Sequence, residues 1–174
     1  SLTGAIPTQT GGLSALETYF DIYSNRLTGA IPTQIGGLSA LEGFFDLDSN
    51  RLTGAIPTQI GQLSRLHAQL LLHSNDLSGT LPSQLGRLST VRQLFAFDIS
   101  IAGTVPSEIG TLAHLTQLFL QSNRLQGSLP SQIGAVGGGV GFIKSVDGTP
   151  HLGRLPLHDL VISDNRLDSE MPRS

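Results

Sequence analysis

LTGAIPTQTGGLSALETYFDIYSNR at residues 2–26 is followed at once by LTGAIPTQIGGLSALEGFFDLDSNR at residues 27–51, with five differences over 25 positions. The same frame begins again further along the chain, each time with Leu or Ile, and an apolar residue and Pro follow four and five positions later. These later starts are Leu52, Leu77, Ile101, Leu125 and Leu167. Self-similarity at a fixed period predicts a stack of like units, each burying its apolar face against its neighbours.

The fifth unit, residues 101–123, shows the internal pattern most clearly. Apolar residues three positions apart, Ile109, Leu112 and Leu115, indicate a 3₁₀ or short helical segment. The alternation around Phe119 is typical of a strand with two inward side chains, and Asn123 closes this strand, where its side chain can bond turn and neighbouring backbone groups. Stacked copies predict a structural asparagine ladder, which is interrupted in the fourth unit by Ile99. Its members are Asn25, Asn50, Asn75, Asn123 and Asn165.

These residues resemble the plant-type leucine-rich repeat, LxxLxLxxNxLxGxIPxxLGxLxx. Six copies of the LxGxIP half cover most of the chain, among them Leu27, Gly29, Ile31 and Pro32. The resemblance implies an α/β fold class: a right-handed leucine-rich-repeat solenoid with a parallel β-sheet on the concave side and short 3₁₀ or α helices on the convex side. Receptor-kinase ectodomains and polygalacturonase-inhibitor-like proteins have this pattern, and the family's usual role is to bind proteins, peptides or glycans.

We expect a single leucine-rich-repeat domain over residues 1–174, with six LxGxIP repeats and a partial seventh. A Gly-rich insertion at residues 135–156 interrupts the sixth repeat, and the frame returns at Leu157. The first and last units lack a stacking neighbour, and uncapped solenoid ends are a solubility problem. Pairing of the ends between copies, absent flanking sequence and an insertion that folds back as a cap all remain open.

Composition excludes several classes of partner. With 10 Lys and Arg against 13 Asp and Glu the net charge is −3, and no basic stripe favours nucleic acid. No apolar run is long enough to predict membrane insertion. The chain has no cysteine, so no thiolate metal site is expected, and we predict no metal and no cofactor. The compartment stays undetermined from these residues, since an extracellular location follows only from the family analogy.

Strand alternation predicts which side chains face outward on the concave sheet. Six of the nine aromatic residues fall on that open face, and Leu71, Phe95, Phe97, Phe119 and Val161 should form an apolar patch with a polar rim. Such patches usually mark an interaction surface. The predicted ligand-binding residues are Tyr19, Tyr23, Phe44, Asp46, Asp48, Leu71, His73, Phe95, Phe97, Phe119, Gln121 and Val161.

The sequence supports a catalytic or a metal-binding site less strongly than a ligand-binding face. Asp48, His73 and Ser74 have the residue types of a nucleophilic triad, but Ser74 adjoins His73 in a turn, so we predict that the protein is not an enzyme. A contact between Asp48 and His73 that senses pH is an alternative. Asp21, Asp46 and Asp48 suggest Ca²⁺ less strongly than a solvated acidic face.

We therefore predict a non-catalytic protein or peptide recognition module that binds through the concave sheet and its aromatic patch. Self-association through that patch or through the uncapped ends is a second outcome. Two alternatives from other classes are adsorption to a surface such as ice and a self-stacking scaffold. The Thr rows behind the ice alternative turn to Ser after the third unit; they are Thr3, Thr28 and Thr53 with Thr8, Thr33 and Thr58.

Overall fold

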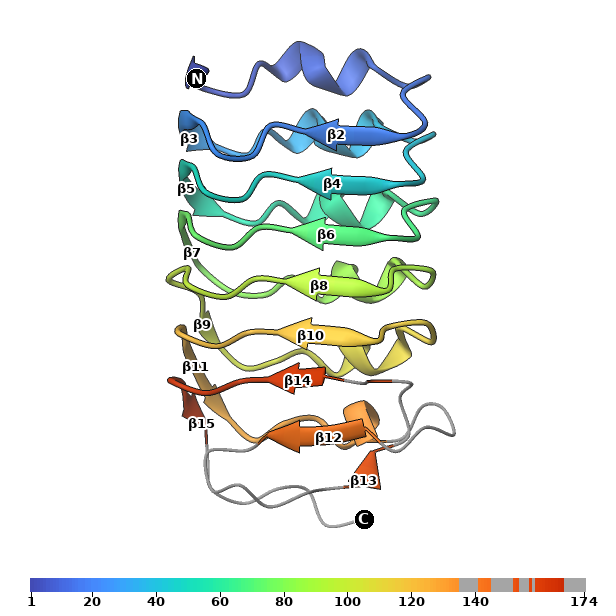
Figure 1. Cartoon of the computed structure of the whole chain (residues 1–174), viewed down its shortest axis with the longest axis vertical. Coiled ribbons are helices and arrows are strands. Elements are labelled where there is room, and N and C mark those ends of the chain that lie inside the picture. Colours follow the sequence, from blue (N-terminus) through green and yellow to red (C-terminus); the bar gives the residue numbers. More distant parts are fainter. Residues whose placement is uncertain (135–140, 145–151, 154–156, 158, 168–174) are drawn as a thin grey trace.

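Each repeat unit forms one coil of a solenoid. The computed structural model describes residues 1–134, 141–144, 152–153, 157 and 159–167. In every complete coil a short strand is followed by a turn, a second strand and a 3₁₀ helix, and successive coils stack along the long axis (Figure 1). The predicted parallel-sheet solenoid is therefore confirmed, and the helical segments of the described residues are all 3₁₀.

The first strand of each coil belongs to an eight-stranded sheet, which we call the front sheet. Like positions pair in parallel register from coil to coil; Phe20 lies beside Phe45, and Phe45 beside Leu70. Its strands, in spatial order, are β2 (Tyr19–Asp21), β4 (Phe44–Asp46), β6 (Gln69–Leu71), β8 (Gln93–Phe95), β10 (Gln117–Phe119), β14 (Asp159–Val161), β12 (Gly141–Lys144) and β13 (Leu152–Gly153).

The second strands, which we call the flank strands, cover one side of the stack. They form a four-stranded sheet in the order β1 (Thr3–Gly4), β3 (Arg26–Ala30), β5 (Arg51–Ala55) and β7 (Asp76–Ser78), and a three-stranded sheet in the order β15 (Arg166–Leu167), β11 (Arg124–Gly127) and β9 (Ala102–Gly103). The single bridge Thr80–Ala102 joins the two sheets.

The 3₁₀ helices lie behind the front sheet (Figure 1). They are η1 (Thr8–Gly12), η2 (Thr33–Gly37), η3 (Thr58–Gln62), η4 (Ser83–Arg87), η5 (Ser107–Thr111) and η6 (Ser131–Gly134). In η1 to η5 the proline before the first helical residue fixes φ near the value that the chain needs there. A glycine in the 3₁₀ helix allows neighbouring coils to approach closely, because any Cβ on Gly61 would overlap the backbone carbonyl of Gln84 in the next coil.

Leucine and isoleucine side chains fill the space between the sheet and the helices. The inward strand pairs that alternation predicts are buried, as in Leu70 with Leu72 and Leu118 with Leu120, all with no exposed surface. In the first two coils aromatic rings replace the leading leucine, and the rings of Phe20 and Phe45 stack with centroids 5.3 Å apart. Burial of these side chains is the main source of stability.

The predicted asparagine ladder ties neighbouring coils together. Asn75, 9 % exposed, accepts the backbone N–H of Leu52 at 3.0 Å through Oδ1. Its Nδ2 lies 3.0 Å from the carbonyl oxygen of Leu47 in the preceding coil and 3.2 Å from that of Leu72 in its own. Asn50, Asn123 and Asn165 make the equivalent contacts. Asn25 accepts the backbone N–H of Leu2 and donates to carbonyls of its own coil alone.

The interruption at Ile99 coincides with the break between the two flank sheets. Ile99 is buried, and it offers no amide to the backbone of the preceding coil. The break falls between β7 and β9, in the two coils that an asparagine at this position would join. Backbone hydrogen bonds still cross the break, from the N–H of Ser100 to the carbonyl of Leu77 at 2.8 Å and from the N–H of Ala102 to that of Gly79 at 2.7 Å.

Strands within the insertion extend the front sheet beyond the last repeat. β12 precedes β14 in sequence but lies outside it, pairing in parallel with Ile143 beside Leu160, while β13 pairs antiparallel to β12. The seventh repeat, in contrast, stacks in normal register, with Leu118 beside Leu160. This placement fits the interpretation of the insertion as a cap for β14. The glycines 137–139 and Met171 lie outside the described residues, and the division into one domain with an insertion stays a prediction.

The asparagine ladder gives a graded test. Asn75→Ala should lower the free energy of unfolding by roughly 3 kcal/mol, because it leaves buried backbone N–H and C=O groups without hydrogen-bond partners. Asn25→Ala should cost only about 1 kcal/mol, because its partner Leu2 is exposed and water can replace the side chain. Urea titrations of both variants measure the difference; equal losses would contradict the role of burial in the ladder.

Candidate binding face on the front sheet

Outward side chains of the front sheet form three columns along the stack, which together we call the front face. The strand register aligns the first column, Tyr19, Phe44, Gln69, Gln93, Gln117 and Asp159, and the second column, Asp21, Asp46, Leu71, Phe95, Phe119 and Val161. The third column follows the strands and consists of Tyr23, Asp48, His73, Phe97, Gln121 and Ser163. All twelve predicted ligand-binding residues thus occupy these columns.

Aromatic rings on the front face stack in pairs. Phe95 and Phe119 are 4.4 Å apart and nearly parallel, and Phe97 stacks on the imidazole of His73 at 4.2 Å. Because they cover one another, the three phenylalanines, Leu71 and Val161 are half-buried rather than fully exposed. The most open aromatic side chains are Tyr19 and Tyr23, at 56 % and 52 % exposure.

A row of amides runs beside the phenylalanines in the first column. Gln69 donates to Gln93, Gln93 donates to Gln117 at 2.6 Å, and Gln117 donates to Asp159 at 2.8 Å. Each amide polarises the next, so the row is a single directional chain ending on a carboxylate. The glutamines were absent from the predicted site, although their repetition in one column was a signal that could have identified the row.

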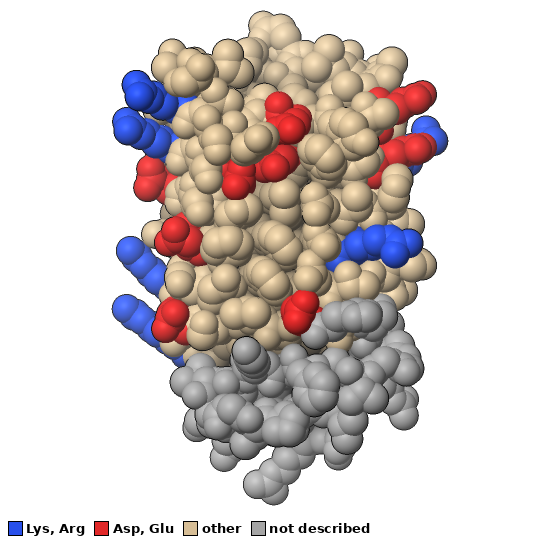
Figure 2. All heavy atoms as spheres, viewed as in Figure 1, with Lys and Arg blue, Asp and Glu red and all other residues tan. Residues whose placement is uncertain are grey.

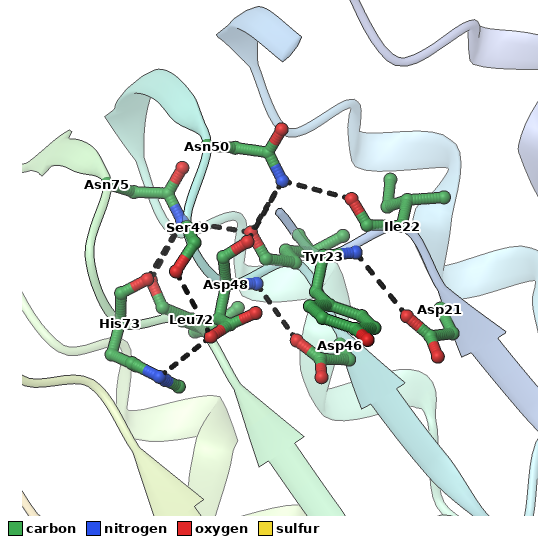
Figure 3. A network of polar contacts seen from close by, with 11 residues as sticks. Asp21, Ile22, Tyr23, Asp46, Asp48, Ser49, Asn50, Leu72, His73 and Asn75 are labelled. Carbon is green, nitrogen blue, oxygen red and sulfur yellow. Dashed lines mark hydrogen bonds and ion pairs between the residues drawn. The ribbon is translucent and has the colours of Figure 1, made fainter. Parts of the chain in front are cut away.

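A second polar feature of the front face is a network of side chains where strands β2, β4 and β6 end (Figure 3). Oδ1 of Asp46 accepts the backbone N–H of Asp48 at 2.9 Å, and Oδ1 of Asp21 lies 3.4 Å from the backbone nitrogen of Tyr23. Nε2 of His73 lies 2.9 Å from Oδ2 of Asp48. The contact predicted between Asp48 and His73 is therefore present.

Burial sets the charge state of this network. It lowers the pKa of His73 below its ordinary 6.5, against the opposing charges of Asp48 and Asp98. At neutral pH the uncharged ring accordingly donates from Nε2 to Asp48. Burial also raises the pKa of Asp46 from 3.8 to about 6; the backbone N–H of Asp48 opposes this shift, and the charges of Asp48 and Asp21 add to it.

The arrangement does not assemble the triad considered from the sequence. His73 bonds to Asp48, and within the described residues no hydroxyl hydrogen-bonds to its ring. Ser74 sits in the turn with φ 53°, as do the equivalent serines of neighbouring coils. Nor do three or more His, Cys, Asp or Glu side chains converge on a metal-sized site in this part of the chain.

Comparison with known proteins identifies the repeat. A sequence model described as Leucine Rich Repeat matches residues 114–136. The ectodomain of the plant membrane receptor kinase GASSHO1/SCHENGEN3 from Arabidopsis thaliana, solved in complex with CASPARIAN STRIP INTEGRITY FACTOR 2, superposes with a TM-score of 0.78 at 33 % identity over 95 % of this chain and 20 % of its own. The chain is a leucine-rich repeat protein.

Two further solved structures bear on this leucine-rich repeat protein. The structure of PEPR1-AtPEP1 matches with a TM-score of 0.80 at 27 % identity, covering 95 % of this chain and 20 % of its own. A plant ice-binding protein matches with a TM-score of 0.73 at 28 % identity, covering 96 % and 55 %. The present chain thus spans about a fifth of the two receptor structures. No curated protein sequence matches it significantly.

No helix in the described ranges of the leucine-rich repeat protein is long and apolar enough to cross a membrane. The front face is uncharged over its middle, with acidic groups gathered toward the N-terminal coils and basic groups along the edges (Figure 2).

The raised pKa of Asp46 gives a stability prediction. Between pH 3.8 and about 6 the folded state binds more protons at this carboxyl than the unfolded chain, so its contribution to stability falls as pH rises through that range. Asp46→Asn keeps an acceptor for the Asp48 N–H and removes the charge. The substitution should raise the free energy of unfolding by about 1 kcal/mol at pH 7.5 and by little near pH 4. The value at pH 7.5 is well below the free energy that corresponds to the whole pKa shift, because solvent screens the carboxylate.

Urea titrations at the two pH values measure this effect. Asp76→Asn is the matched control, since it removes the same charge from an exposed position on β7. A stabilisation of Asp46→Asn that is equal at both pH values, or a loss at pH 7.5, would contradict the assigned cause.

Proposed function

We propose that this chain is a non-catalytic recognition module that binds a protein or peptide through its front face. The observation that carries the proposal is the placement of six aromatic side chains on the open face of a sheet whose core positions hold aliphatic side chains apart from Phe20 and Phe45. Aromatic anchors supply large contact area at low entropic cost and dominate binding energies in interfaces.

The front face also fits an extended partner. Stacked phenylalanines, the glutamine row and the acidic network lie side by side over successive coils, so a segment running along the stack would meet each of them in turn. Support by analogy comes from the receptor structures, one of which contains a factor bound to its ectodomain. Loss of affinity on changing the anchors, without loss of the fold, is the consequence to test.

Phe97→Ser combined with Phe119→Ser should abolish binding to peptides that panning of a random displayed library selects on the wild-type chain. Hot-spot aromatic residues each contribute about 2 kcal/mol or more, so the affinity should fall at least about 30-fold. Since both rings are only half-buried, the thermal midpoint should fall by no more than about 5 °C.

Leu13→Ser is the matched control, because Leu13 is 51 % exposed and lies outside the front face. Fluorescence anisotropy gives the affinities and circular dichroism the midpoints. Retained affinity in the double variant would refute the front face as the binding site, and collapse of the fold would refute the outward placement of the two rings.

A second candidate function, adsorption to ice, is favoured by the flank of the solenoid. Thr3, Thr28 and Thr53 on the flank strands and Thr8, Thr33 and Thr58 at the starts of η1 to η3 are all exposed. Ala5, Ala30 and Ala55 lie between them and are also exposed, so small side chains recur over three coils. Exposed Arg26, Arg51 and Asp76 lie beside the threonine row of the strands. This surface ends at a hollow lined by Thr80, Pro82 and Thr104, where the flank sheet breaks.

An ice-recrystallisation assay separates the two candidates. Adsorption by the flank requires that the wild-type chain inhibit crystal growth, that Thr28→Lys with Thr33→Lys remove the inhibition, and that the double phenylalanine variant retain it. Absence of inhibition by the wild-type chain would eliminate this candidate and leave the recognition proposal untouched.

A further inference from the structure

The N-terminal end of the front face differs from the rest in charge. Three carboxylates, Asp21, Asp46 and Asp48, lie there on two neighbouring coils together with the ring of Tyr23 (Figure 3). The rings of Tyr19 and Phe44 begin the same two strands and stack on each other. We call these six residues the acidic corner. None of the three front-face columns contains Lys or Arg, so no basic residue of the face balances these charges.

The carboxylates of the acidic corner lack cationic partners. Within the described residues the ion pairs are Arg65 with Glu42, away from this corner, and His73 with Asp48, in which burial favours the uncharged ring. Asp48 Oδ1 is buried without a hydrogen-bond partner. A buried carboxylate without compensation is costly, and an arriving cation would relieve that cost.

Asp46 lies at the centre of the acidic corner and has no cationic partner within the described residues. It is 9 % exposed, and its Oδ1 accepts the backbone N–H of Asp48. Its position in the second column places it on the front face beside Asp21, so a partner on that face meets both carboxyl groups without rearrangement of the fold.

Aromatic surface adjoins these carboxylates. The rings of Tyr19 and Phe44 stack at 4.2 Å with an interplanar angle of 23°, next to Asp21 and Asp46 in the adjacent column. A flat ring beside a carboxylate suits a guanidinium or ammonium group, which can lie over the ring and hydrogen-bond to the oxygens. The carboxylates do not converge tightly enough to count as a metal site, so a broad organic cation fits them better than Ca²⁺.

The apolar part of the face begins directly beyond the acidic corner. In the second column Asp21 and Asp46 are followed by Leu71, Phe95 and Phe119 on successive strands. A strand spacing of about 4.8 Å places the first apolar contact within a residue or two of the cation along an extended partner.

From this juxtaposition we propose that the partner of the front face is a peptide segment carrying an Arg or Lys side chain beside apolar residues. The cation occupies the acidic corner, and the apolar side chains lie over Leu71, Phe95 and Phe119. This inference rests on the proposed recognition function and specifies the chemistry of its ligand.

Panning a random displayed peptide library on the wild-type chain tests the inference. Selected sequences should be enriched in Arg or Lys adjacent to aliphatic or aromatic residues. Binders that depend on the phenylalanines but show no basic enrichment would overturn the cation site and leave the recognition proposal standing. Failure to recover any binder sensitive to Phe97→Ser with Phe119→Ser would overturn both.

Variants then locate the cation on the face. Asp46→Asn should weaken a selected basic peptide roughly tenfold, since a charge-assisted hydrogen bond is lost. A control peptide has Gln in place of its Arg or Lys. Asp46→Asn should leave the affinity for this control peptide almost unchanged. Asp76→Asn, which removes an equal charge outside the face, should weaken neither peptide more than twofold. Equal losses of affinity for the basic peptide in Asp46→Asn and Asp76→Asn would show that only the net charge of the protein matters. That result would refute the cation site.

Discussion

One side-chain amide per coil sets the geometry on which the rest of the structure depends. Each ladder asparagine accepts a backbone N–H at or just before the second strand of the preceding coil. From Asn50 onward it also donates to carbonyls of that coil and of its own. Stacked turns would otherwise bury unsatisfied backbone groups between coils. The position without this amide, Ile99, is also where the flank strands separate into two sheets, although the front sheet continues unbroken past it. The ladder therefore satisfies the backbone of the turns between coils, whereas strand pairing and the apolar core hold the front sheet.

A regular frame of this kind separates structure from recognition within every repeat. The leucines, the proline before each 3₁₀ helix and the glycine that meets the next coil are restricted by packing. Outward positions have no such restriction and can vary. Between the first two units Tyr19 gives way to Phe44, which keeps an aromatic ring, whereas Tyr23 gives way to Asp48, which adds a carboxylate to the acidic corner.

Periodicity was enough to predict the coil, the inward pairs, the ladder and the three columns, because all of these are local and recur. Three features required the folded chain. The position of β12 outside β14 reverses sequence order, and nothing local encodes it. The half-burial of Phe95 and Phe119 comes from rings of different coils covering one another. The raised pKa of Asp46 depends on its burial and on neighbouring charges, which a sequence places in a column but cannot quantify.

The central claim is that ligands meet the front face and not the flank. The most direct measurement is a ¹H–¹⁵N NMR titration of the chain with a peptide selected on it. The account predicts chemical-shift changes concentrated in residues 19–23, 44–48, 69–73, 93–97 and 117–121. Changes concentrated instead in the flank strands and the starts of η1 to η3, with the front face unaffected, would contradict it.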